Sequence, residues 1–174
     1  MMARWWKLKN LPHRLRGWRE EAKRLAKIGL NAELSARVRH PDGQWVDLGV
    51  ASRRVITTVG AGFIVDAFQN LVELEAMNYH DSGTGTNAES AGDTALQSPA
   101  GPARVAGVQS EGTSVQYKTV ATITYTTTQT ITEHGIFSLA TGGVLLDRSV
   151  FSGISVVNGS QIEFTYTLTV STGT

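Results

Sequence analysis

Histidine and carboxylate side chains are the groups in this sequence best suited to metal binding or acid–base chemistry. The histidines are His13, His40, His80 and His134. None of them stands at metal-ligand spacing from another, and no HExxH-type motif is present. The chain has no cysteine, which excludes disulfides and cysteine-containing metal sites. We therefore predict no metal site and no cofactor, with each histidine solvated or hydrogen-bonded, and we single out His80-Asp81 as the pair to inspect.

Two other arrangements contain the residue types of an enzyme site. Gly83 and Gly85 lie in a glycine-rich stretch, but no Lys-Ser/Thr pair and no helix start follow, so a phosphate-binding loop is not expected. Glu133 and Asp147 fall on segments predicted to be strands, and neighbouring strands are where a glycosidase can place its two carboxylates. Carboxylates on solvated strand faces explain the same pattern, and no GxSxG motif is present. We predict a protein without catalytic residues.

The charges of the chain are divided unevenly between its two ends. Residues 1–40 hold eleven Lys and Arg against three acids, a net charge of +8, whereas residues 41–174 hold five bases against twelve acids, a net charge of −7. A basic segment attached to an acidic body is typical of an interaction tail. We therefore divide the chain into a basic arm, residues 1–30, and a body, residues 31–174.

The arm is predicted to be an amphipathic helix. Asn10 suits the N-cap, Pro12 suits the first turn, and Gly29 suits the residue after the helix end. Apolar residues recur every three or four positions and form one narrow stripe. The stripe consists of Leu11, Leu15, Trp18, Ala22 and Leu25.

Such a stripe needs a surface to cover it, and four kinds of surface are open. Tryptophan interleaved with Lys and Arg suits a grooved protein surface, where Trp and Arg are favoured binding residues. The same composition suits nucleic acid, a membrane surface, or packing within the chain. We expect a protein partner rather than nucleic acid or membrane. The predicted partner-binding residues are Trp5, Trp6, Lys7, Lys9, Leu11, Arg14, Leu15, Trp18, Arg19 and Leu25.

The first half of the body contains a hairpin, a short strand and a helix. Alternating apolar residues over 34–38 and a strand over 45–52 flank the turn sequence His40-Pro41-Asp42-Gly43. A further short strand is expected within 53–58, and a helix over 60–74. The residues predicted to share one face of that helix are Phe63, Ala67, Phe68, Leu71 and Leu74.

The second half is predicted to be a long polar loop followed by strands only. The loop covers residues 81–102, and loops of this length are usually functional or at an interface. The strands are expected over 121–125, 131–139, 144–151 and 162–170, with Asn158-Gly159 as the strongest hairpin signal. Short strands separated by turns indicate a mainly β, antiparallel sandwich or jelly-roll-like body with one internal helix. We predict a homotrimer whose interface includes Tyr125, Phe137, Phe164 and Tyr166.

Three stretches carry a resemblance to a known group of proteins. They are residues 82–86 (SGTGT) with 92–96 (GDTAL), residues 131–137 (ITEHGIF), and residues 144–151 (VLLDRSVF) with the C-terminal alternating strand. Over roughly residues 50–172 the chain resembles structural proteins of tailed-bacteriophage virions. The resemblance implies a virion protein assembled in the cytoplasm of a bacterial host.

Three functions are then open. The first is a capsid decoration or cement protein that binds the major capsid protein through its arm. The second is an adaptor in the neck, the tail or the base of a fibre. The third is a surface module that binds or cleaves glycans with the loop over 81–102.

Overall fold

The computed structural model describes residues 29–53, 55–72 and 76–171, of which Leu30–Thr169 form one compact unit. The predicted arm residues, Trp5 to Leu25, lie outside the described residues. Within this part the chain is mainly β with one helix. In chain order the elements are β1 (Gly29–Arg39), β2 (Trp45–Ser52), β3 (Val55–Ile56), α2 (Thr58–Phe68), β4 (Tyr79–Gly83), β5 (Val105–Ala106), β6 (Val108–Glu111), β7 (Gln116–Thr124), β8 (Gln129–Phe137), β9 (Leu145–Val156) and β10 (Gln161–Ser171).

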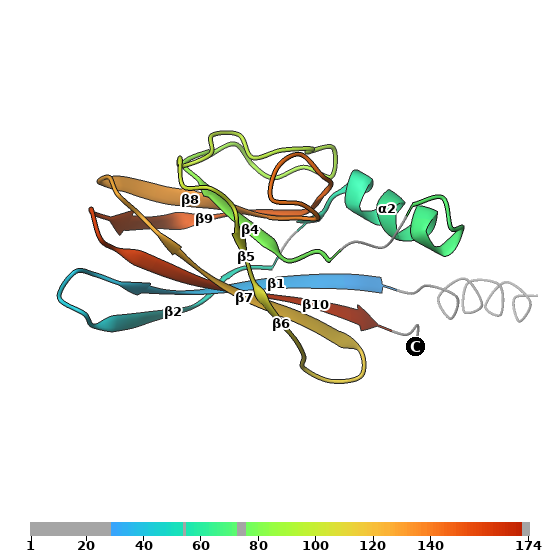
Figure 1. The fold of residues 1–174 in the computed structure, drawn as a ribbon, viewed down its shortest axis with the longest axis horizontal. Coiled ribbons are helices and arrows are strands. Elements are labelled where there is room, and N and C mark those ends of the chain that lie inside the picture. The colour runs from blue at the N-terminus through green and yellow to red at the C-terminus, as the bar shows by residue number, and fades with distance from the viewer. Residues whose placement is uncertain (1–28, 54, 73–75, 172–174) are drawn as a thin grey trace, which may run out of the picture. The chain divides into compact units, whose positions relative to one another are not determined.

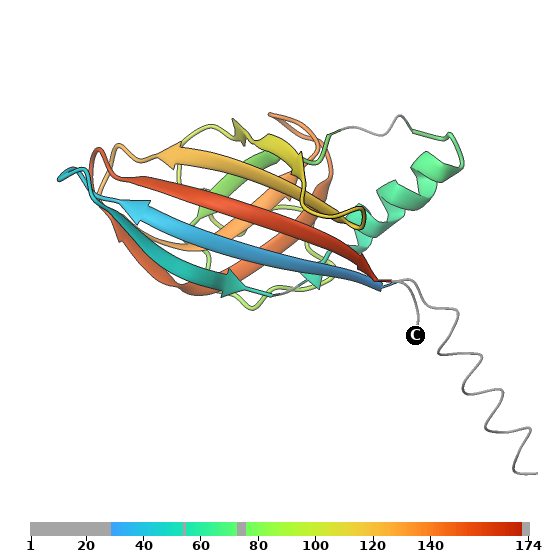
Figure 2. The same ribbon diagram turned by 90° about the horizontal axis from the view of Figure 1, so that it is seen from below.

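Two five-stranded sheets stack face to face, as Figures 1 and 2 show. One sheet has the order β2-β1-β10-β7-β6, and the other has the order β3-β9-β8-β4-β5. The predicted antiparallel sandwich is therefore confirmed at this level. β1 already begins at Gly29, so the boundary predicted after residue 30 falls inside a strand.

The hairpin of β1 and β2 follows the prediction closely. Leu34, Ala36 and Val38 are buried at every second position of β1, as a half-buried strand requires. The turn between the strands contains Gly43, whose φ of 86° lies in the left-handed region that glycine tolerates. Arg37 and Arg39 point outward and lie over the ring of Trp45.

The Asn158-Gly159 turn reverses the chain, but the predicted hairpin is wrong. β9 belongs to one sheet and β10 to the other, where β10 pairs along its length with β7. The turn is closed by the Ser160 N–H, which donates to the carbonyl oxygen of Val157 at 2.9 Å. It is also joined to the end of β7, because the Gly159 N–H donates to the carbonyl oxygen of Tyr125, the residue after that strand, at 2.8 Å. A turn sequence fixes the local reversal, whereas the partner of each strand depends on distant residues.

The internal helix is confirmed, but it ends earlier than predicted. Thr57 caps its start, since the Thr57 Oγ1 accepts from the Gly60 N–H at 3.0 Å. At the other end Asn70 adopts a left-handed φ of 56°, and the Leu71 N–H donates to the carbonyl oxygen of Asp66 at 3.0 Å. Together with the Asn70 N–H bond to Ala67 O, this is a Schellman motif, which terminates a helix.

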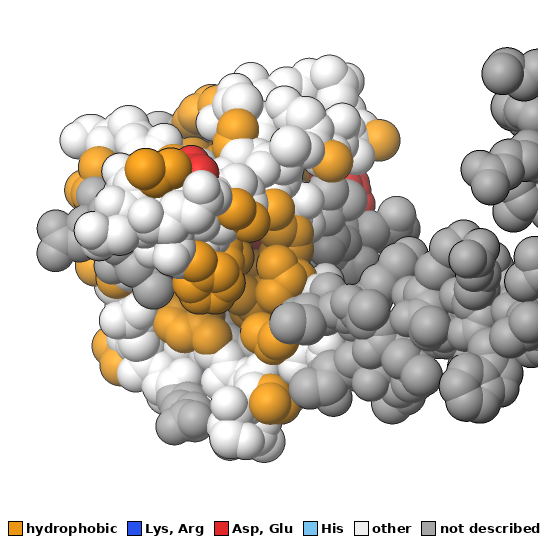
Figure 3. Space-filling model, turned by 90° about the vertical axis from the view of Figure 1, so that its right-hand side faces the viewer, with side chains coloured by type: hydrophobic (Ala, Val, Ile, Leu, Met, Phe, Trp, Pro, Cys, Tyr) orange, Lys and Arg blue, Asp and Glu red, His pale blue; other side chains and the backbone are white. Residues whose placement is uncertain are grey.

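The predicted inner face of the helix is only partly correct, and one of its residues, Leu74, lies outside the described residues. Phe63 is buried against the sandwich core, whereas Phe68 is 85% exposed and Leu71 is 68% exposed. Phe68 follows Phe63 by five residues, which is about 140° around a helix, so the two side chains leave on different faces. Figure 3 looks at this end of the molecule and shows hydrophobic side chains gathered on its surface.

Two clusters of apolar side chains stabilise the body. The larger one fills the space between the sheets and includes Ile123, Ile136, Leu146 and Ile162. The smaller one lies under the long loop, and it consists of Leu96, Phe137 and Leu145, with Tyr79 packed against it.

The predicted interface residues belong to these two clusters. Tyr125, Phe164 and Tyr166 are completely buried in the larger cluster, and Phe137 is 2% exposed in the smaller one. These four side chains cannot contact a second subunit, so their assignment to an oligomer interface is wrong. Large aromatic residues on inward-facing strand positions are used for the core of this small domain.

Candidate functional site

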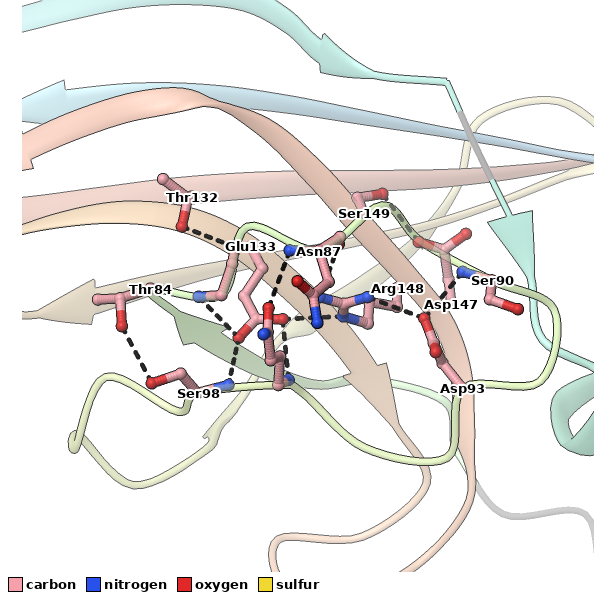
Figure 4. A network of polar contacts seen from close by, with 12 residues as sticks. Thr84, Asn87, Ser90, Asp93, Ser98, Thr132, Glu133, Asp147, Arg148 and Ser149 are labelled. Atoms are coloured by element: carbon pink, nitrogen blue, oxygen red, sulfur yellow. Dashed lines mark hydrogen bonds and ion pairs between the residues drawn. The ribbon is translucent and has the colours of Figure 1, made fainter.

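The polar groups of the body concentrate around Glu133, a carboxylate with no solvent exposure. Its Oε1 accepts from the backbone N–H groups of Gly85 at 3.1 Å and Ser98 at 2.7 Å, and its Oε2 accepts from that of Gln97 at 3.0 Å. Figure 4 shows these bonds reaching two different parts of the long loop. One side chain on β8 therefore fixes the loop backbone on both sides of its bend.

Arg148, on the neighbouring strand β9, completes the network. Its Nε donates to Glu133 Oε2 at 2.8 Å, its Nη1 to Asp93 Oδ2 at 2.9 Å, and its Nη2 to the carbonyl oxygen of Asn87 at 3.2 Å. Burial lowers the pKa of Arg148, but the bonds to Asp93 and Glu133 outweigh it and raise that pKa. The pKa of Asp93 is lowered: burial opposes this, and the bonds from Ser90 and Arg148 prevail. Arg148 and Asp93 are therefore both ionised at neutral pH.

The close approach of Glu133 requires glycine at Gly83, the last residue of β4, and at Gly85 in the loop. A Cβ atom added at Gly83 would meet Glu133 Oε1 at 2.4 Å, and one added at Gly85 would meet the same atom at 2.5 Å. No other residue type leaves this space. These glycines therefore admit a carboxylate to the backbone, which explains their presence without a phosphate-binding role.

Further bonds hold the rest of the loop. Thr132 Oγ1 donates to the Gly85 carbonyl oxygen at 2.8 Å, and Thr84 Oγ1 donates to Ser98 Oγ at 3.1 Å. The carbonyl oxygen of Ala91 accepts from the Thr58 N–H at 2.7 Å, which joins the loop to the start of α2. A long loop rich in small polar residues is thus held in one conformation.

This network brings together the three stretches that carry the sequence resemblance. Glu133 comes from the second stretch, Arg148 from the third, and Gly83, Gly85 and Asp93 from the first. Gly135 joins them in packing, because a Cβ atom there would meet Leu96 Cδ2 at 2.9 Å.

The prediction that the loop begins at residue 81 is wrong by three residues, since Asp81 to Gly83 belong to β4.

Glu133 has no capacity left for acid–base catalysis. A carboxylate offers about four acceptor positions, and three backbone N–H groups and one guanidinium N–H occupy them. The side chain is also sealed from solvent. Glu133 and Asp147 do lie on adjacent strands, but both are completely buried, so the interpretation as solvated strand carboxylates is wrong.

Asp147 is a buried carboxyl with an unusual proton affinity. Burial raises its pKa to about 7, a shift that a hydrogen bond from Ser149 Oγ at 2.9 Å only partly opposes. A carboxyl with this pKa suits proton transfer. It has no solvent exposure, however, so no substrate reaches it without a rearrangement of the core.

Two histidines form a buried pair between the sheets. His80 Nδ1 lies 3.0 Å from His134 Nε2, and His80 Nε2 lies 3.2 Å from Thr119 Oγ1 on the opposite sheet. Burial lowers the pKa of His80 to about 3, and burial together with the charge of His80 lowers the pKa of His134. The expectation of a hydrogen-bonding role is confirmed for both residues. Asp81 is not part of this pair, because its Oδ2 accepts from Arg104 Nε at 3.3 Å.

The described part of the chain shows no metal centre and no membrane span. Among those residues, no group of three or more histidine and acidic side chains is arranged to hold a metal ion. None of the helical segments within that range has the length and apolar character needed to cross a membrane.

No protein-family model matches the chain, and a search of curated proteins found no similar sequence.

Proposed function

We propose that this protein is a non-enzymatic structural protein of a tailed-bacteriophage virion, and specifically a capsid decoration or cement protein. One observation carries the non-enzymatic part of the proposal. The best candidates for chemistry, Glu133 and Arg148, are buried and saturated by bonds that hold a loop. A body built in this way offers a rigid surface rather than a reaction centre.

The basic arm supplies the attachment in this proposal. Its apolar stripe, Leu11 to Leu25, gives affinity for the major capsid protein or another virion protein, and its Lys and Arg residues guide orientation and association rate. The body, a jelly-roll-like sandwich assembled as a homotrimer, then covers the lattice and stabilises the particle. Nucleic acid and membrane are not the partners in this proposal.

The test is a binding assay with purified capsids that lack this protein. We expect the full chain to bind, and a chain without residues 1–28 to keep the β-sheet circular dichroism of the body while losing at least 90% of the binding. Trp18→Asp in the full chain should weaken binding in the same direction. Arg53→Glu, a charge change on the body at a 71% exposed side chain, is the matched control and should bind normally. Equal binding by the truncated and full-length chains would refute the role of the arm.

Copy number separates this role from that of a neck, tail or fibre-base adaptor. A decoration protein occurs in hundreds of copies per particle, and an adaptor in about a dozen or fewer. Quantitative mass spectrometry of intact particles, with the major capsid protein as the internal standard, gives the number directly.

A glycan-binding module is the second candidate, because the loop presents fixed polar groups to solvent. Asn87, Ser90, Thr94 and Gln97 are exposed, and the backbone of two of them is held, that of Gln97 by Glu133 and that of Asn87 by Arg148. A fixed backbone lowers the entropic cost of binding. A glycan array and a reducing-sugar release assay with the full chain test this candidate, and no signal in either would eliminate it.

A further inference from the structure

The sandwich has an open side between β2 and β9. β2 is the edge strand of its sheet. In the other sheet β3 is only two residues long and pairs with Arg148 and Asp147, so within the described ranges β9 beyond Arg148 has a neighbouring strand on one side only. The short β3 therefore leaves the inner face of β2 without a covering strand.

The uncovered space is an apolar groove of about 560 Å³. Val46, Leu48 and Val50 of β2 contribute side chains that are 48%, 41% and 40% exposed. Val38, Ala51, Phe151 and Ile154 add further apolar surface, and the remaining lining residues are His40, Ser152, Gly153 and Ser155. Among the residues that the structure describes, no Lys, Arg, Asp or Glu lines the groove, so this lining suits an uncharged, apolar occupant.

The geometry of both strands favours side chains over an added strand as that occupant. The β1–β2 pairing is irregular between Leu34 and Arg37, and Gly49 on β2 has a φ of 65°. The β8–β9 pairing shifts register between Ile131 and Glu133, next to the groove. Such bulges interrupt the regular ladder that an incoming strand would need.

The end of α2 presents an exposed apolar surface whose character matches that of the apolar groove. We define the α2 tip as Val65, Phe68 and Leu71, which are 53%, 85% and 68% exposed. The Schellman motif turns the chain after the helix so that Leu71 and Val65 occupy the positions that usually contact each other in this motif. The hydrogen bonds of the motif fix the α2 tip, and its three side chains are uncharged, with the partly exposed Asp66 beside them.

We propose that the α2 tip of one copy inserts into the β2–β9 groove of a second copy. Figures 1 and 2 both place α2 at the end opposite the β1–β2 turn, so one copy can offer its tip and its groove at the same time. A contact between two different surfaces is heterologous, and it closes into a ring when the rotation permits. The contact rests on the homotrimer of the proposed function and replaces the interface that was placed on buried aromatic residues.

The test measures the mass of the full-length chain by sedimentation velocity over a range of concentrations. We expect assemblies larger than a dimer of the 18.7 kDa chain, with a closed trimer as the main species. Phe68→Asp places a negative charge on the α2 tip, and Leu48→Asp places one in the groove. Both sites are exposed, so the unfolding temperature should be preserved while association weakens at least tenfold. Val108→Asp, at a side chain that is 76% exposed on β6, is the matched control and should associate normally.

Mixing the two variants gives the decisive result. Phe68→Asp keeps an intact groove and Leu48→Asp keeps an intact tip, so the mixture should form a 1:1 dimer and nothing larger. A monomeric wild type, normal association by either variant, or no dimer in the mixture would each overturn the inference; normal association by both variants would point to the arm instead. Capsid binding is measured separately, so a failure of this interface is distinguishable from a failure of the proposed function.

Discussion

Replacing Glu133 with glutamine tests whether one buried carboxylate holds the long loop. The substitution keeps the shape of the side chain, removes its charge, and puts an NH2 group where an oxygen accepted bonds. The matched control is Glu163→Gln. Glu163 pairs with Arg37 at 2.8 Å, the same distance as the Glu133–Arg148 pair, but its pair is exposed on the surface of the other sheet.

The expected difference follows from burial. Removing one partner of a buried, hydrogen-bonded ion pair costs about 3–5 kcal/mol. In Glu133→Gln the Arg148 charge keeps only its pair with Asp93, and an NH2 group faces N–H donors that had bonded a carboxylate oxygen. Arg148 and Glu133 have side-chain exposures of 3% and 0%. The side chains of Arg37 and Glu163 are 46% and 20% exposed, and a surface pair of this kind contributes about 0–1 kcal/mol. For a domain of this size, 3–5 kcal/mol corresponds to a fall in unfolding temperature of roughly 6–20 °C.

Calorimetry and amide hydrogen exchange together give the readout. Calorimetry should show the large fall for Glu133→Gln and a fall of at most about 4 °C for Glu163→Gln, by the same conversion. Exchange should accelerate at the Gly85, Gln97 and Ser98 amides, which donate to Glu133, in the first variant only. Equal unfolding temperatures for the two variants, with unchanged exchange at these amides, would refute the anchoring role of Glu133.

Three further predictions concern the core and the helix. His80→Gln should flatten the loss of stability between pH 6.5 and 4 in urea titrations, because the folded-state pKa of about 3 lets only the unfolded chain bind that proton in this range. Asp147→Asn should stabilise the protein by about 2–4 kcal/mol more at pH 8 than at pH 4, because the wild type loses stability as pH rises from 3.8 to the folded-state pKa of about 7; a pH-independent effect would contradict this. Gly60→Ala should destabilise the protein by about 1–3 kcal/mol, since its Cβ would meet Leu146 Cα at 2.7 Å. Gly62→Ala, with nothing within 4 Å, should instead stabilise the helix by about 0.5–1 kcal/mol, and the same sign for both alanine variants in thermal unfolding would contradict the packing argument.

Local sequence patterns were sufficient to predict the elements that depend on neighbouring residues. Ile162, Phe164, Tyr166 and Leu168 alternate with polar residues, and each of the four is buried in β10 as that alternation predicts. The β1–β2 hairpin was predicted for the same reason, and the internal helix was predicted to begin at Gly60, two residues after its start at Thr58. Strand periodicity, turn residues and caps act over a few neighbouring positions, so they can be recognised without knowing the fold.

The contacts between distant residues could not be predicted from such patterns and are seen in the fold. Glu133 was predicted to be a strand carboxylate, but its role depends on glycines about 50 positions earlier and on Arg148 in the next strand. The Asn158-Gly159 turn specified a reversal, yet the strand after it pairs with β7. Phe164 was predicted to lie at an interface, but it lies in the core. Sheet order and burial are set by packing of the whole chain, and short-range sequence patterns do not contain that information.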